Sequence, residues 1–312
     1  MELLAWVGRQ RTRAIAALVV IGILIPPLGA VLKPYVTEAV IGLLCIAFLR
    51  IDISAFRSYM RRPHIVIAAT VWTTFTIPVL FAISTKFLGV DSANPALYTG
   101  LILQAVASPM MAAPAFAALM GLDATLVLIT LILGTAITPF SAPFFASLLS
   151  LDLALSPTAL GIKLSAILAG SAIVGLFLRK VVGSIKIARF RDEIDGINII
   201  ILLVFVSAVM GEVGIEFLRQ PLLMLGLIAL AFIVFALLLA TTYVVFLATG
   251  AERAFAIAMM TSQRNMGLML AGTGGVVPDL TWLYFAVAQF PIYLSPLILR
   301  PVAKSITGNP KL

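Results

Sequence analysis

Long apolar runs separated by short charged or polar segments make up most of the chain. A bilayer core about 30 Å thick is crossed by a helix of about 20 apolar residues. Runs of that kind predict ten membrane spans: 14–32, 34–50, 64–86, 94–119, 124–149, 158–180, 195–215, 221–249, 252–274 and 280–303. The second run is short, and the fourth and ninth contain helix breakers. The pattern predicts an all-α polytopic membrane protein.

The composition places the chain in the lipid bilayer. Of its 312 residues, 62% are hydrophobic and only 11% are charged, whereas a soluble domain is about half apolar and a quarter charged. The net charge of +8 comes from basic residues dispersed among the apolar runs, not from a basic stripe. We therefore expect lipid, and no nucleic acid, as the partner of this surface.

The distribution of basic residues gives the orientation. With the N-terminus in the cytoplasm and ten crossings, sixteen of the 21 basic residues fall in inside segments. Three fall outside, and two fall within spans. This positive-inside bias predicts a bacterial-type inner (plasma) membrane protein with both termini cytoplasmic. The first run follows three arginines and resembles a signal peptide, but its length and the lack of a clear cleavage site favour a retained span.

Metal and catalytic chemistry have little support in the sequence. Cys45 is the only cysteine and lies in an apolar run, so no intramolecular disulfide is possible. His64, the only histidine, lies at a span boundary with no cluster of metal-ligating residues. We expect no cofactor, no metal and no enzymatic activity, since no nucleophile–base pair is apparent.

The ten predicted spans divide into two halves of five, residues 1–156 and 157–312. Because five is odd, the second half enters the membrane from the opposite side, so a duplicated unit must be inverted. The last span of each half contains spaced prolines: Pro139 and Pro143 in the first, Pro291 and Pro296 in the second.

The fourth span of each half is interrupted near its middle. In residues 94–119 the interruption is Ser108-Pro109-Met110-Met111 followed by Pro114; in residues 252–274 it is Thr261-Ser262-Gln263-Arg264-Asn265-Met266-Gly267. Proline removes an amide donor, and backbone freed at membrane depth is tolerated only against protein or a water-filled cavity. Paired broken spans at matching positions of two halves indicate a transport site.

These segments supply the candidate residues. We expect substrate contacts from Arg264, Asn265, Gln263, Ser108, Thr73, Met110 and Met111. We expect the crossover or gate to be formed by Pro109, Pro114, Gly267, Thr130, Ser262 and Thr261. Simpler roles remain open for some of them: the Thr73 hydroxyl can bond its own helix, Thr130 can link helices, and the methionines can simply pack.

Arg264 is the most unusual of these residues. A guanidinium at mid-membrane costs a few kcal/mol on the insertion scale, and no carboxylate of the chain is predicted at its depth. Its partner is then either backbone carbonyls or an anionic substrate, and we favour the substrate.

This layout resembles the bile acid:sodium symporter family, a ten-helix fold with inverted repeats. The stretch Gln263-Arg264-Asn265-Met266-Gly267-Leu268 resembles the family's ninth-helix segment, in which a Glu is followed four residues later by Gln-Asn-x-Gly-Leu. Residues 108–115 resemble its fourth-helix Pro-Gly-Gly-x-x-Ser-Asn more weakly. The resemblance implies crossing helices 4 and 9 in a core of spans 3–5 and 8–10, which moves against a panel of spans 1, 2, 6 and 7.

The chain departs from the family at the positions that bind two sodium ions. Met260 replaces the ninth-helix Glu, Arg264 replaces the Gln, and Pro114-Ala115 replace the fourth-helix Ser-Asn. Thr130 and Asn265 match family residues, and Thr73 stands where the family has a Gln. These changes remove oxygen ligands and place a cation where a cation would bind.

We therefore expect a facilitator or exchanger of a small organic anion, or a zwitterion, that works by elevator-like alternating access without sodium. Arg264 would supply a fixed positive charge in place of the ion. The nearest alternative is a sodium-coupled, bile-acid-like anion symporter with rebuilt sodium sites. A channel fits broken helices in inverted repeats less well, and the short loops leave no room for a sensory output domain.

Overall fold

The computed structural model describes residues 4, 6, 20–50 and 63–308. Within these residues every regular element is a helix, and the β-type pairing consists of one isolated bridge. The start of the first expected span, residues 14–19, lies outside the described residues, as do the basic residues of the first and second inside segments apart from Arg50.

The helices follow the apolar runs closely. The first part of the chain forms α3 (Pro26–Leu32), η1 (Lys33–Tyr35), α4 (Val36–Leu49), α6 (Pro63–Val71), η2 (Trp72–Thr76), α7 (Ile77–Phe87), α8 (Val90–Ala93), α9 (Pro95–Val106), α10 (Ala113–Leu119) and α11 (Ala124–Leu148). The remainder forms α12 (Pro157–Val182), α13 (Ser184–Arg189), α14 (Arg191–Met210), α15 (Val213–Arg219), α16 (Pro221–Phe246), η3 (Leu247–Thr249), α17 (Ala251–Ser262), α18 (Met266–Gly272), α19 (Asp279–Val287) and α20 (Gln289–Thr307).

Seven helical stretches of the described chain are long and apolar enough to cross a membrane: Pro26–Leu49, Pro63–Phe87, Ala124–Leu148, Pro157–Val182, Arg191–Arg219, Pro221–Thr249 and Asp279–Thr307. The chain is thus a polytopic, all-helical membrane protein. The group has seven members and not ten because the first and second expected spans meet in the single stretch Pro26–Leu49, and because the fourth and ninth each consist of two short helices, α9 with α10 and α17 with α18. The count of ten spans and the inverted halves stay predictions.

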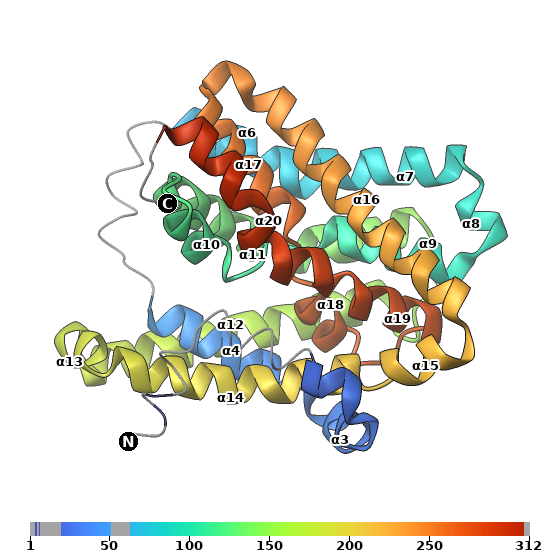
Figure 1. Cartoon of the computed structure of the whole chain (residues 1–312), viewed down its shortest axis with the longest axis horizontal. Helices are drawn as coiled ribbons and strands as arrows, with labels where there is room; N and C mark the ends of the chain where they lie inside the picture. The colour runs from blue at the N-terminus through green and yellow to red at the C-terminus, as the bar shows by residue number, and fades with distance from the viewer. Residues whose placement is uncertain (1–3, 5, 7–19, 51–62, 309–312) are drawn as a thin grey trace.

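The helices form two layers (Figure 1). One layer contains α3, α4, α12 and α14, in which α4 packs against α12 and α14, and α14 packs against α3. The other layer contains α6 to α11, α16, α17 and α20, in which α17 packs on α16 and α10 on α11. Helices α18 and α19 lie where the layers meet, since α18 contacts both α4 and α12.

Glycines allow the first layer to pack closely. Gly29 of α3 faces Gly211 at the end of α14, and a Cβ added to Gly29 would lie 2.5 Å from the Cα of Gly211. Small residues let membrane helices approach to backbone contact. Because the obstructing atom is backbone, a side chain here would separate the helices.

Gly29→Ala is therefore expected to destabilise the protein by about 1–3 kcal/mol, the usual range for overpacking a close contact. Thermal unfolding of the purified protein measures the effect. Gly170→Ala is the matched control, because a Cβ on this α12 glycine would meet no atom within 4 Å. Equal melting temperatures for the two variants would show that the contact between α3 and α14 is not tight.

Candidate functional site

Two broken helices cross at the centre of the molecule. Between α9 and α10, and between α17 and α18, the chain is not helical. The two segments pair antiparallel through Pro109 and Arg264. The amide of Met110 donates to the carbonyl of Gln263 at 2.8 Å, and the amide of Asn265 donates to the carbonyl of Ser108 at 2.8 Å. The two breaks thus satisfy each other's freed backbone groups.

Local chemistry explains where the helices stop and start. Proline at 109 cannot donate a helical hydrogen bond, and α9 ends three residues before it, with Ala107 extended. On the other side, the Asn265 side chain accepts from the amide of Leu268 at 3.1 Å and so caps α18. Asparagine is among the preferred residues at this capping position.

The Arg264 side chain is buried behind this crossover, with 1% of its surface exposed. Its Nη1 donates to two backbone carbonyls, those of Thr73 and Ala107, each at 3.0 Å. Nε and Nη2 are also buried, and they have no acceptor among the described residues. Arg264 forms no salt bridge with any residue that the structure describes.

The carbonyl of Thr73 is available because the helix around it is irregular. Residues 72–76 form a π-helical turn in which the amide of Ile77 bonds to Trp72, instead of to Thr73 as in an α-helix. If the π-helical pattern continued, the carbonyl of Thr73 would accept from the amide of residue 78. Residue 78 is a proline and has no amide hydrogen. Such π-bulges often occur at functional sites, and here the bulge frees a carbonyl oxygen for Arg264.

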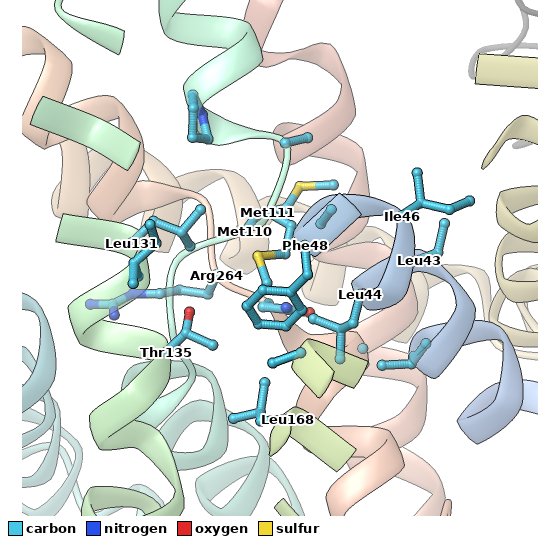
Figure 2. Close-up of a pocket in the computed structure, with 18 of the residues that line it drawn as sticks. Leu43, Leu44, Ile46, Phe48, Met110, Met111, Leu131, Thr135, Leu168 and Arg264 are labelled. Carbon is cyan, nitrogen blue, oxygen red and sulfur yellow. The ribbon is translucent and has the colours of Figure 1, made fainter. Parts of the chain in front are cut away.

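A cavity of about 840 Å³ lies in front of the crossover, between the two layers. Figure 2 shows Leu44 and Phe48 of α4 close to Met110 and Met111, while the Arg264 side chain extends away from α4. The walls are mainly apolar, with polar side chains that include Thr135, Asn198 and Gln289. This combination is typical of a site for a small organic ligand.

Some of the residues that the sequence predicted for the substrate site, the crossover or the altered sodium positions line this cavity. The expected residues that line it are Met110, Met111, Pro114, Ala115, Arg264, Asn265 and Gly267. A Cβ on Gly267 would lie 2.9 Å from Cζ of Phe205 in α14, so the crossover approaches the first layer closely at this point.

The other expected residues do not line the cavity. The hydroxyls of Thr73, Thr261 and Ser262 donate to carbonyls of their own helices. The Gln263 side chain is buried and donates to Ser295 at 2.7 Å. The hydroxyls of Ser108 and Thr130 are buried and have no partner among the described residues. Met260 is fully buried among apolar side chains of the second layer.

Some residues of the site have no strong signal in the sequence. Thr135 lines the cavity with a buried hydroxyl that has no described partner. Arg50 also lines the cavity, at the end of α4, where its Nη1 lies 2.6 Å from a carboxylate oxygen of Asp195. Pro78, five residues after Thr73 in an otherwise apolar span, is the one local clue to the π-helical turn.

Comparison with known proteins gives one family match. The model of the sodium bile acid symporter family matches residues 38–220, more than half of the chain. The matched range includes the first broken segment and α11, and it ends before the second broken segment. No curated protein matches the chain.

Proposed function

The chain belongs to the sodium bile acid symporter family, and on that premise we propose that it is a secondary transporter of a small organic anion that works without sodium. Family members are membrane transporters. The specific part of the proposal concerns Arg264, which takes the place of the coupling ion at the helix crossover.

The observation that carries the proposal is the pair of hydrogen bonds from Arg264 to the carbonyls of Thr73 and Ala107. Backbone carbonyls are oxygen ligands that selectivity filters use for alkali cations. A guanidinium that occupies two of them, and that is always charged, supplies a permanent internal cation. A sodium ion beside it would meet electrostatic repulsion.

The residues at the family's sodium positions do not fit the ion. Met260 is apolar and fully buried where the resembling family segment has a Glu. Pro114 and Ala115 replace its Ser-Asn and leave no side-chain oxygen there. Hard cations of this kind are held by several oxygen ligands. The mechanism proposed for this chain therefore contains no sodium-binding step.

An anionic substrate suits both the charge and the cavity. Arg264 makes no salt bridge within the described chain, and its charge acts through a low-dielectric interior, where it is screened far less than in water. The apolar walls around Met110, Met111 and Phe48 suit the body of an amphipathic acid. A zwitterion whose acidic group faces the crossover is accommodated by the same arrangement.

The two layers suggest how the substrate crosses. In the proposed cycle, the layer that holds the crossover moves against α3, α4, α12 and α14, so that the cavity between them opens to each side in turn. Paired broken helices at a central site are typical of alternating access. The basic residues of the expected inside segments support the further proposal of an inner-membrane protein with both termini in the cytoplasm.

A sodium-coupled symporter with rebuilt sites is the second candidate. Thr130 matches a family hydroxyl at a sodium site, and its oxygen is buried without a described partner. This alternative differs from the proposal in one measurable property, a requirement for sodium at fixed ionic strength and membrane potential.

Transport by the reconstituted protein tests the proposal. Vesicles in choline medium would be given a panel of labelled amphipathic carboxylic acids and the neutral amide of each. We expect at least one acid to be taken up without sodium and its amide to be excluded, because the amide lacks the negative charge. Uptake of acid and amide alike, or uptake that appears only with sodium, would contradict the proposal.

A further inference from the structure

Two of the three nitrogens of the Arg264 guanidinium group have no acceptor among the residues that the structure describes. Nη1 is occupied by the carbonyls of Thr73 and Ala107, while Nε and Nη2 are buried and unpartnered within the described chain. Buried polar groups are nearly always hydrogen-bonded, and a buried charge is nearly always compensated. The unsatisfied donors of Arg264 therefore indicate a missing acceptor that is negatively charged.

Further unpartnered donors lie on the elements around this guanidinium. Thr135 of α11 lines the same cavity as Arg264, and Figure 2 shows its hydroxyl directed toward the Arg264 side chain. The adjacent Gly134 approaches the crossover, since a Cβ added there would lie 3.4 Å from Cδ of Pro109. The hydroxyls of Ser108 and Thr130 are also buried without a described partner. These groups can donate, and none of them carries a negative charge.

Burial and charge together limit the class of ligand. Because only 1% of Arg264 is exposed, the body of an organic anion in the cavity cannot surround Nε and Nη2. Water can accept hydrogen bonds from these atoms but cannot neutralise the guanidinium. A monatomic anion meets both requirements, since it accepts from several donors in any direction and carries one charge.

We propose that Arg264 and Thr135, which both line the cavity, bind a halide, chloride in the cell, at the helix crossover. This inference rests on the transport function proposed above and extends it: the halide is the counter-anion of Arg264 while no organic anion is bound. The two anions compensate the same positive charge, so the binding of one weakens the binding of the other. The protein then exchanges chloride for the organic anion.

Thermal unfolding in choline chloride and choline gluconate, at equal ionic strength and without sodium, tests the halide site. We expect chloride, but not the much larger gluconate, to raise the melting temperature in a saturable manner. Thr135→Val should raise the half-saturating chloride concentration about tenfold, as expected for the loss of one hydrogen bond to a charged group. Thr138→Val is the matched control, because this buried α11 hydroxyl already donates to the carbonyl of Gly134 at 2.8 Å.

The outcomes separate the halide site from the transport function. An equal chloride response in the Thr135→Val and Thr138→Val proteins, or no chloride response in the wild type, would overturn the halide site. Sodium-free uptake of organic acids would still support the proposed function in that case. If Thr135→Val does not fold, bromide located by anomalous scattering in wild-type crystals decides: density beside Arg264 supports the site, and its absence at saturating bromide overturns it.

Discussion

Replacing Arg264 with glutamine is expected to abolish transport of the organic anion while the protein still inserts into the membrane. The substitution removes the buried positive charge of Arg264 at the crossover. Truncating one partner of a buried charge pair costs about 2–5 kcal/mol of binding, which lowers affinity by more than tenfold. Uptake into vesicles at substrate concentrations below saturation measures the loss.

The same variant should also be less stable. The glutamine amide nitrogen is two bonds closer to the backbone than Nη1, so it does not take the place of Nη1 as the donor to the carbonyls of Thr73 and Ala107. A buried acceptor left without a partner costs about 1–3 kcal/mol. A lower melting temperature together with lost transport is therefore the expected result.

Two further variants separate charge from structure. Arg264→Lys keeps the charge but lacks the planar fork of donors, so we expect partial transport. Arg253→Gln is the matched control. Arg253 lies near the start of α17, the helix that precedes the break, and donates to the carbonyl of Thr249, away from the cavity. Wild-type uptake by a folded Arg264→Gln protein would refute the role given to this arginine.

The double variant Met260→Glu/Arg264→Gln is expected to gain a response to sodium. It introduces the Glu and the Gln that the similar ninth-helix segment of the family has at these two positions. It also removes the internal cation. It also frees the carbonyls of Thr73 and Ala107 as oxygen ligands. A ligand that binds only the folded state adds about 2.7 kcal/mol at a hundred times its dissociation constant, so the rise in melting temperature should be readily measured.

The single variants serve as controls for this gain. Met260→Glu alone adds the carboxylate but keeps the internal cation of Arg264, so it should not gain a response to sodium. Arg264→Gln alone lacks the anionic ligand and should respond weakly. A double variant that folds but shows no difference between sodium and choline would mean that the crossover lacks a latent cation site.

The sequence predicted the breaks in both helices but not how the side chains meet there. Pro109 and the polar run around Arg264 cannot continue a lipid-facing helix, so their positions followed from backbone chemistry alone. The partner of Arg264 did not follow. The sequence favoured an anionic substrate over carbonyls, whereas the structure assigns Nη1 to two carbonyls and gives Nε and Nη2 no acceptor within the described part of the chain.

The remaining features of the site depend on long-range packing, which the sequence did not predict. The carbonyl of Thr73 becomes available only through the π-helical turn, and its contact with Arg264 joins residues 191 positions apart. Thr135 and Phe48 belong to the cavity because α4 and α11 face the crossover, and apolar periodicity does not specify which faces of such helices meet. The family match covers residues 38–220, so the motif around Arg264 that suggested the family lies beyond it.

Thermal unfolding of the wild-type protein, titrated with sodium gluconate against choline gluconate at fixed ionic strength, tests the central claim most directly. Gluconate as the common anion removes any contribution from chloride. If Arg264 replaces the coupling ion, the two salts should give the same melting temperature at every concentration. A saturable rise that is specific to sodium would contradict the account and would identify the protein as a sodium-coupled symporter.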